Sequence, residues 1–182
     1  MTKLLKISKK IGSFDKKINV SGDKSLSIRW VLLASQAIGR SKAYNLLMSE
    51  DVIAAIHSIK KLGIKVKIHK NYCEVYGNGI NGFKYKNNLT IDAGNSGTLG
   101  RLILGLLIKS PKKIKLIGDR SLSKRDFSRV TIPLEKFGAK FYYKTKNRLP
   151  LSILGKKSVK GINYLENKGS AQCKSSVMLG AL

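Results

Sequence analysis

The stretch "SEDVIAAIHSIKKLGIKVKI" at residues 49–68 returns in altered form at residues 124–143, as "KRDFSRVTIPLEKFGAKFYY". In the first part of both stretches, hydrophobic residues recur at the spacing of one helix face. In the last part of both, hydrophobic and polar residues alternate as in a strand. Between the two patterns lie Gly63 in the first copy and Gly138 in the second. Glycine directly after a helix readily adopts the left-handed conformation that ends it. The sequence therefore predicts, twice, a helix that stops at glycine and leads into a strand.

A second strand is expected after each of these strands. In the first copy it is "YCEVYG" at 72–77, which follows a turn at Lys70 and Asn71. In the second copy it is "PLSIL" at 150–154, after the polar stretch "KTKNR" at 144–148. Two strands joined by a short polar turn predict a hairpin. Each copy of the repeat should therefore close with a pair of antiparallel strands.

A further strand and helix precede each copy. The expected strands are "KINV" at 17–20 and "NNLTIDA" at 87–93, and a third opening appears in "GINYLENK" at 161–168. Lys24, Gly97 and Gln172 then occupy corresponding helix starts. The sequence thus predicts an α+β fold made of β-α-β-α-β-β units of about 75 residues, with two full copies and the start of a third. Because the third copy stops within its first helix, we expect the chain to be incomplete.

Each of these three helices is preceded by a loop of small and polar residues, at 21–25, 94–98 and 169–172. Helix starts have free backbone N–H groups and a partial positive charge, which together attract anions. Capping of the helix is the alternative explanation of the same loops, and at Thr98 a cap and a ligand contact are equally compatible with the pattern. Three loops at equivalent positions, with Lys24, Arg29, Arg101 and Arg125 nearby, favour an anionic small molecule.

The composition narrows the class of protein. The chain has 182 residues, of which 42% are hydrophobic, as in a folded domain. Its longest apolar run, 102–108, is much shorter than the roughly 20 residues that cross a bilayer, and the N-terminus carries no signal-type apolar stretch. Cys73, Cys173, His57 and His69 show no metal-binding spacing. We expect a cytoplasmic protein with no membrane association, metal or cofactor.

The formal net charge of +26 raises the alternative of a basic, non-enzymatic nucleic-acid-binding domain. Such a domain would bind duplexes tightly, with a steep dependence on salt. Only seven of the 36 basic residues are arginine, however, and the lysines are scattered along the chain. No helix-turn-helix, zinc-finger or aromatic RNA-binding signature accompanies them. We therefore expect no nucleic-acid partner and a lysine-rich surface that attracts anionic metabolites.

Four stretches in order resemble the signatures of the EPSP synthase family, the 3-phosphoshikimate 1-carboxyvinyltransferases. They are "SGDKSLSIR" at 21–29, "DAGNSGTLGRLILG" at 92–105, "GDRSLSKRDFSRVTIPLEKFGA" at 118–139 and "GSAQCKSS" at 169–176. The resemblance implies two lobes of three β-α-β-α-β-β units each, with helix starts facing a cleft between the lobes. Residues 15–182 would form an incomplete N-terminal lobe, and residues 1–14 would hold a strand of the other lobe.

The resemblance also implies a reaction and roles for single residues. The family transfers the enolpyruvyl group of phosphoenolpyruvate to the 5-hydroxyl of shikimate 3-phosphate, and Lys24 would be catalytic by screening charge in the transition state. Shikimate 3-phosphate would contact Lys24, Ser25, Arg29, Ser170 and Gln172. Phosphoenolpyruvate would contact Lys24, Asn95, Gly97, Thr98, Arg125 and Gln172. For Arg101 the sequence leaves open an ion pair with a carboxylate inside the lobe.

A related family, which acts on UDP-N-acetylglucosamine, is the nearest alternative within the same fold. Its members carry a reactive cysteine in a loop, whereas the corresponding segment here, "GDRSLSKRD" at 118–126, contains none. Cys73 and Cys173 are instead expected to be small buried residues on a strand and a helix. Since the resemblance covers only the N-terminal two-fifths of the family's usual length, this chain is expected to be inactive alone and to be part of a monomer when complete.

Overall fold

The two similar stretches form the same succession of elements in a computed structural model, which describes residues 4, 6, 8–10, 12–13, 15–167 and 169–182. The first part of the chain contains α1 (Lys24–Gln36), β1 (Ile38–Tyr44), α2 (Glu50–Lys61), β2 (Lys65–Ile68) and β3 (Tyr72–Asn78). The second contains β4 (Leu89–Asp92), α3 (Gly97–Leu106), β5 (Ile114–Ile117), α4 (Arg120–Ser123), α5 (Ser128–Lys136), β6 (Lys140–Tyr143) and β7 (Leu151–Leu154). Helix α6 (Ala171–Ala181) follows.

Both predicted helix stops and both predicted hairpins are confirmed. Gly63 has φ +87° directly after the last turn of α2, and Gly138 has φ +106° directly after that of α5. Strand β2 pairs antiparallel with β3, and β6 pairs antiparallel with β7. The local patterns of helix end and turn were therefore sufficient to predict these elements.

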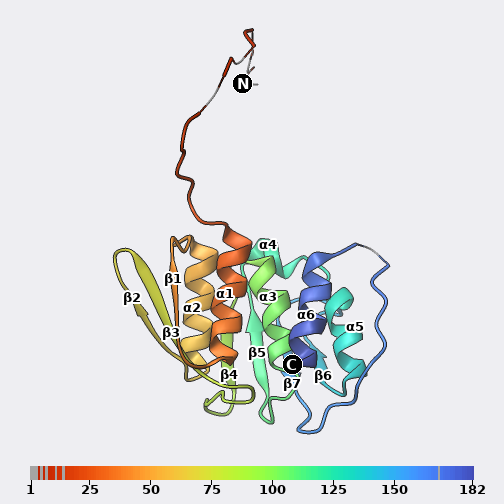
Figure 1. The fold of residues 1–182 in the computed structure, drawn as a ribbon. Coiled ribbons are helices and arrows are strands. Elements are labelled where there is room, and N and C mark those ends of the chain that lie inside the picture. The colour runs from red at the N-terminus through yellow and green to blue at the C-terminus, as the bar shows by residue number, and fades with distance from the viewer. Residues whose placement is uncertain (1–3, 5, 7, 11, 14, 168) are drawn as a thin grey trace.

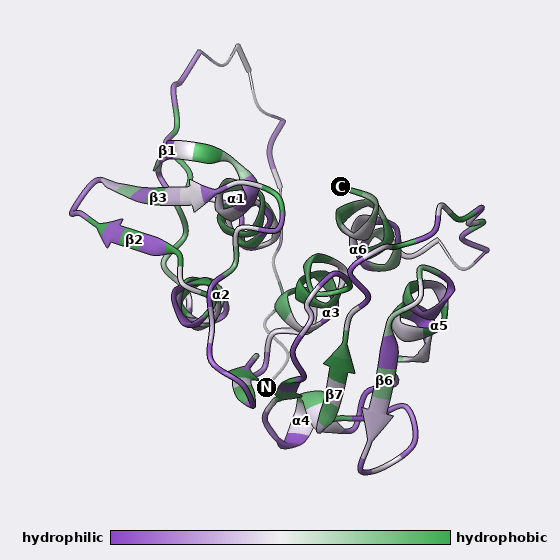
Figure 2. Ribbon diagram, turned by 90° about the horizontal axis from the view of Figure 1, so that it is seen from below, coloured by the Kyte–Doolittle hydropathy of each residue, from purple (hydrophilic) through white to green (hydrophobic). Residues whose placement is uncertain are grey.

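The strands form two separate sheets. One has the order β1-β3-β2, and the other has the order β4-β5-β7-β6, in which only β4 and β5 are parallel. Figure 1 shows α1, α3 and α6 running side by side in the same direction. Figure 2, viewed along the helices, shows α1 beside β1 and β3, and α3 between β7 and α6. This arrangement places the starts of all three helices at one end of the molecule.

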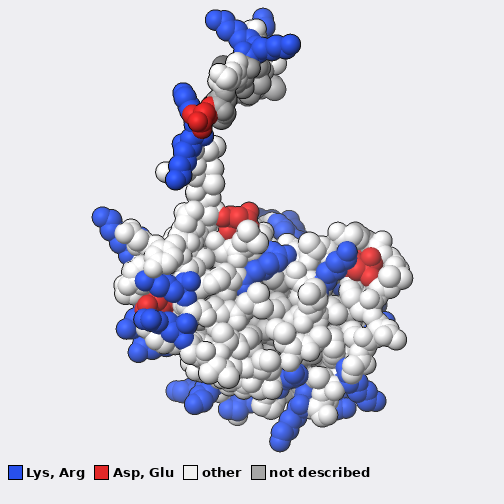
Figure 3. Space-filling model, in the orientation of Figure 1, with Lys and Arg blue, Asp and Glu red and all other residues white. Residues whose placement is uncertain are grey.

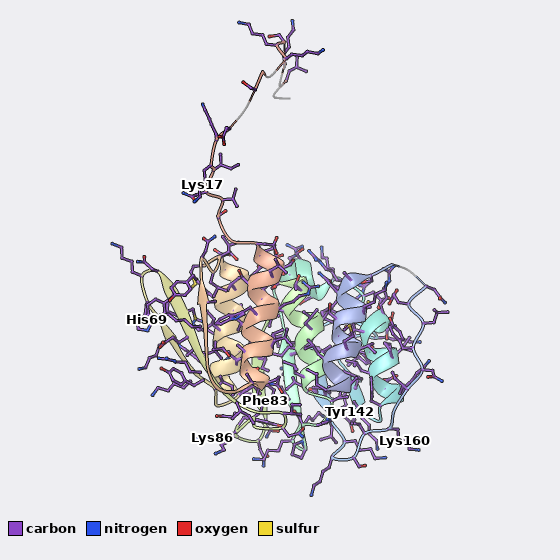
Figure 4. All side chains as sticks on the ribbon, viewed as in Figure 1. Lys17, His69, Phe83, Lys86, Tyr142 and Lys160 are labelled. Carbon is purple, nitrogen blue, oxygen red and sulfur yellow. The ribbon has the colours of Figure 1, made fainter. Side chains whose placement is uncertain are left out.

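Two predicted strands are absent from the described residues, so the expectation of two full copies and a third opening strand is not met. Residues 17–20 form no strand and pair with none of the described strands. The carbonyl oxygen of Val20 accepts a hydrogen bond from Nδ2 of Asn45 at 3.2 Å, and before it the segment, marked by Lys17 in Figure 4, rises away from the folded body. Residues 161–167 likewise form no strand. Their alternating pattern has another cause: Ile162 and Tyr164 pack against the hydrophobic core while Leu165 is exposed.

The expected strand in residues 1–14 falls largely outside the described residues, since 1–3, 5, 7, 11 and 14 are not described. Its described residues lie in no helix or strand. Assignment of this segment to a second lobe therefore stays a prediction.

The core is continuous between the sheets and the helices. Its largest fully buried side chains include Ile28, Ile56, Leu102 and Phe127, which come from four different helices or their flanks. Cys73 and Cys173 are buried free thiols, as predicted.

In the part of the chain that the structure describes, no helix is both long and apolar enough to span a membrane. Figure 3 shows lysine and arginine spread over the visible face and along the N-terminal segment, not gathered in one patch.

Candidate functional site

Helices α1, α3 and α6 each begin with a side chain that caps the first turn. Oδ1 of Asp23 accepts a hydrogen bond from Leu26 N at 2.7 Å, and Oγ of Ser96 accepts one from Leu99 N at 3.2 Å. Ser170 caps α6 in the same way, with its Oγ accepting from Cys173 N at 3.3 Å. A cap uses one of the free N–H groups of a helix start and leaves others for a ligand. The cap of α3 is thus Ser96, and Thr98 has a different role.

A cavity of about 480 Å³ lies at the starts of α5 and α6. It is lined by Arg101, Arg125, Asp126, Ser128, Arg129, Ser170, Gln172 and Cys173. Three guanidinium groups against one carboxylate make the lining strongly positive. Hydroxyl groups and a carboxamide add neutral hydrogen-bonding groups to these charges. A cavity of this chemistry suits a small polyanion, for which arginine offers two-pronged hydrogen bonds.

Arg101 connects α3 to α6 across this cavity. Its Nη1 donates to Oε1 of Gln172 at 2.9 Å and to the carbonyl oxygen of Gly97 at 3.3 Å. Nε2 of Gln172 then donates to Oγ1 of Thr98 at 3.1 Å. The guanidinium lies over the ring of Phe127, with Cζ 5.3 Å from the ring centroid. Thr98 and Arg101 of α3 thus form one hydrogen-bonded chain with Gln172 of α6, more than 70 residues later in the sequence.

Electrostatics at Arg101 favour a bound anion. Burial lowers the pKa of the Arg101 guanidinium, and the nearby positive charges of Arg125 and Arg129 act in the same direction. Both effects disfavour the charged form, so a negative charge in the cavity would offset them. The local structure therefore holds three like charges together at a cost that an anionic ligand reduces.

Gly97 is the point at which two of these guanidiniums meet. A Cβ atom at this position would lie 2.9 Å from Nη1 of Arg101 and 2.9 Å from Nη1 of Arg125. Real Cβ atoms essentially never come so close to other heavy atoms, so a side chain here would displace at least one arginine. Glycine as the first residue of α3 therefore lets both guanidinium groups lie close to the start of this helix.

The start of α1 forms a second group of candidate residues. Nζ of Lys24 lies 3.0 Å from Oδ2 of Asp51 in α2. Arg29 donates to the carbonyl oxygen of Ser25 at 3.3 Å and to Oγ of Ser175 at 3.3 Å. Arg29 thereby connects α1 to α6, one turn below Gln172. The two groups of residues share α6 as a common neighbour.

The structure brings most of the predicted site residues to these two places. Gly97, Thr98, Arg125, Ser170 and Gln172 lie in or beside the cavity. Lys24, Ser25 and Arg29 lie at the start of α1. Asn95 is exposed, and its Nδ2 donates to Oδ2 of Asp119 at 2.8 Å. None of these placements tests a contact with substrate, so the assigned roles stay predictions.

Sequence reasoning missed several participants. Arg101 is in none of the three described salt bridges; it donates to Gln172 and Gly97 instead of forming the ion pair that the sequence left open. Arg129 lines the cavity, although only its spacing of four residues from Arg125 could have drawn attention to it. Asp51, in the first turn of α2, pairs with Lys24. The contacts of Arg101 with Gln172 and of Lys24 with Asp51 join separate elements and leave no local signal.

Comparison with known proteins agrees with this geometry. The family model described as EPSP synthase (3-phosphoshikimate 1-carboxyvinyltransferase) matches residues 8–182. A 3-phosphoshikimate 1-carboxyvinyltransferase of Streptococcus suis is 38% identical over 179 residues, which cover 98% of this chain and 42% of the relative. The corresponding protein of Streptococcus mutans is 38% identical over 166 residues, or 91% of this chain and 39% of the relative. The chain thus spans about two-fifths of the length of these curated relatives.

A solved structure supports the same assignment. The EPSP synthase of Acinetobacter baumannii superposes with a TM-score of 0.84 at 33% sequence identity, over 91% of this chain and 37% of that one. The family model, the relatives and the fold therefore agree over nearly the whole chain. The chain belongs to the EPSP synthase (3-phosphoshikimate 1-carboxyvinyltransferase) family.

Proposed function

We propose that this protein transfers the enolpyruvyl group of phosphoenolpyruvate to the 5-hydroxyl of shikimate 3-phosphate, releasing phosphate. The observation that carries the proposal is the cavity at the starts of α5 and α6, where Arg101, Arg125 and Arg129 surround Ser170 and Gln172. Both substrates are polyanions, and this is the strongest concentration of arginine among the candidate residues. Membership in the family supplies the reaction, and the cavity supplies the means to hold its charged groups.

Phosphoenolpyruvate is assigned to the α3 side of the site. Its phosphate would accept hydrogen bonds from the N–H of Gly97 at the start of α3 and from the guanidinium of Arg125. Thr98 and Gln172 would complete this side, and Asn95 would reach it by exchanging its hydrogen bond with Asp119 for one with the ligand. The helix start and the arginine both favour negative charge, so the phosphate is held by two independent effects.

Shikimate 3-phosphate is assigned to the α1 and α6 side. Ser25 and Arg29 would hold its carboxylate, and Ser170 with Gln172 would hold its 3-phosphate and ring hydroxyls. The hydrogen bond of Arg29 to Ser175 supports this assignment, because it fixes the arginine between the two helix starts. Lys24 would lie between the substrates, where its ammonium screens the phosphate and hydroxyl charges that develop during addition.

The reaction requires groups from both sides of a closed site. Because the chain spans 39–42% of the length of its relatives, we propose that residues outside it complete the cleft. Phosphate release by the 182-residue chain alone should then stay at background. We further propose that the complete protein is a cytoplasmic monomer without a nucleic-acid partner.

The test is titration of the isotope-labelled chain with each substrate, monitored by backbone amide resonances. Shikimate 3-phosphate should shift amides at the starts of α1 and α6, with a dissociation constant on the order of millimolar in an open half-site. Phosphoenolpyruvate should shift amides at the start of α3 and beside Arg125. Inorganic phosphate at equal ionic strength is the control ligand. Equal shifts with all three ligands, or shifts spread over the lysine surface, would contradict the proposal.

Variants sharpen this test. Arg29→Ala should weaken the binding of shikimate 3-phosphate, and Arg125→Met should weaken the binding of phosphoenolpyruvate. Each effect should be on the order of tenfold, because each variant removes charge-assisted hydrogen bonds. Arg40→Met is the matched control, since Arg40 lies on β1 and pairs with Glu74, away from the helix starts. If Arg40→Met weakens the binding of both ligands as strongly as the site variants do, the ligands are attracted by net charge alone.

A further inference from the structure

Arg101 has no assigned contact with substrate, yet its side chain has two hydrogen bonds in the cavity, as many as that of the assigned residue Gln172. Nη1 of Arg101 donates both to Gly97 O and to Gln172 Oε1, and the guanidinium group lies over the ring of Phe127. A guanidinium carries donors and no acceptor, so every partner must present an oxygen to it. Arg101 therefore dictates which end of the Gln172 carboxamide faces the guanidinium and which end faces Thr98.

The consequence for Gln172 is a fixed orientation. With Oε1 facing Arg101, Nε2 faces Thr98 and donates to its hydroxyl at 3.1 Å. Nε2 carries two hydrogens, and among the described residues Thr98 accepts only one of them, so the other is available at the cavity wall. The terminal torsion of glutamine is otherwise broad and nearly two-fold. Without Arg101, the carboxamide could turn its oxygen toward an incoming anion.

We propose that Arg101 is a positioning residue that holds Gln172 with its N–H donors toward the cavity. It acts through Gln172, and its backbone helps to keep the two helices together, because Ser176 Oγ donates to the Arg101 carbonyl oxygen at 2.8 Å. This second hydrogen bond remains when the guanidinium is removed. The effect on phosphoenolpyruvate binding rests on the function proposed above, whereas the orientation of Gln172 in the free protein does not.

The first experiment measures the side-chain amide resonances of Gln172 in the ligand-free, 182-residue chain. Their loss in Gln172→Met assigns them. In Arg101→Met they should move toward the positions of solvent-exposed glutamine, and the same should happen in Arg101→Lys, because an ammonium group lacks the planar fork that contacts Gln172 and Gly97 together. In the charge-matched control Arg40→Met they should stay in place. Resonances that are the same in Arg101→Met and in the unsubstituted chain would overturn the proposal.

The second experiment adds phosphoenolpyruvate to the same proteins. Arg101→Met and Arg101→Lys should both weaken binding on the order of tenfold, whereas Arg40→Met should change it by less than about twofold. If Arg101→Lys binds as well as the unsubstituted chain while Arg101→Met does not, Arg101 supplies charge alone and the positioning role is wrong. If the unsubstituted chain binds no phosphoenolpyruvate but the amide resonances respond as expected, the proposed function fails and the positioning role stands.

Thr98→Val tests the other end of the hydrogen-bonded chain. Valine keeps the shape of this buried residue and removes the oxygen that accepts from Nε2, while Arg101 stays in place. One N–H resonance of Gln172 should therefore shift strongly. Because this variant leaves the guanidinium intact, it decides the question even if Arg101→Met does not fold. If the side-chain amide resonances of Gln172 are unchanged in Thr98→Val, the proposed orientation is wrong.

Discussion

Nζ of Lys24, the first residue of α1, lies 3.0 Å from Oδ2 of Asp51 in the first turn of α2. The lysine side chain is 53% exposed and that of the aspartate is 19% exposed. The pair connects the proposed catalytic residue to a helix that carries none of the four family-like motifs. It also neutralises part of the charge that Lys24 would present to the substrates.

Asp51→Asn should therefore strengthen the binding of shikimate 3-phosphate a few-fold at low salt, because it removes a negative charge beside Lys24. The free energy of unfolding should fall by no more than about 1 kcal/mol, as for other solvent-accessible ion pairs. Titration at two salt concentrations measures the first effect, and urea unfolding measures the second. Glu50→Gln, one residue earlier, removes an equal charge without the contact to Lys24. Equal gains in the two variants would show that the pair itself has no influence.

Gly97→Ala should weaken the binding of phosphoenolpyruvate on the order of tenfold. The added methyl group would lie 2.9 Å from Nη1 of both Arg101 and Arg125 and would displace one of these arginines. Shikimate 3-phosphate, assigned to other contacts, should be affected less. Amide titrations with both ligands measure this difference. Gly161→Ala is the matched control, since a Cβ at that position meets nothing within 4 Å. Unchanged binding of phosphoenolpyruvate by Gly97→Ala would show that Arg125 is not needed in its present position.

Ser96→Ala should lower the free energy of unfolding by about 1 kcal/mol, because it removes the side-chain cap of α3. Ser96 is fully buried, so its partner Leu99 N would also lose its hydrogen bond away from water. Urea unfolding followed by circular dichroism gives the change. Ser21→Ala, at an exposed position before α1, is the control and should stay within about 0.5 kcal/mol. A loss in Ser96→Ala no larger than that of the control would exclude capping as the role of this serine.

Asp126 should contribute to the pH dependence of stability. Hydrogen bonds from the hydroxyl and backbone N–H of Ser128 hold the pKa of Asp126 below its usual value. Because the folded pKa is the lower one, the contribution is present above the unfolded value of about 3.9 and is lost as pH falls through the folded pKa. Asp126→Asn should therefore lose less stability than the unsubstituted chain between about pH 5 and pH 3.

Urea unfolding at several pH values across this window measures the difference for Asp126. Asp15→Asn removes a carboxylate from the N-terminal segment and should follow the profile of the unsubstituted chain. Identical profiles for Asp126→Asn and the unsubstituted chain would show that the hydrogen bonds of Ser128 do not stabilise the folded state.

Most elements of the fold could be predicted from the sequence because their signals are local. The helix stops at Gly63 and Gly138 depend on one backbone conformation each, and the hairpin that leads into β3 depends on a two-residue turn. The strand expected at 17–20 shows the limit of such signals. Its residues favour an extended chain, but a strand also requires a partner, and the segment rises away from the folded body.

The sequence by itself determined that three similar helix starts follow polar loops and that family-like motifs supply their basic residues. Only the tertiary structure decided which of these side chains meet. Arg101 and Gln172 are 71 residues apart, and Lys24 and Asp51 belong to different helices. Capping and periodicity act over a few residues, whereas these pairs exist because α3 packs on α6 and α1 packs on α2 through the buried core. Core packing, which no local pattern encodes, therefore sets the geometry of the site.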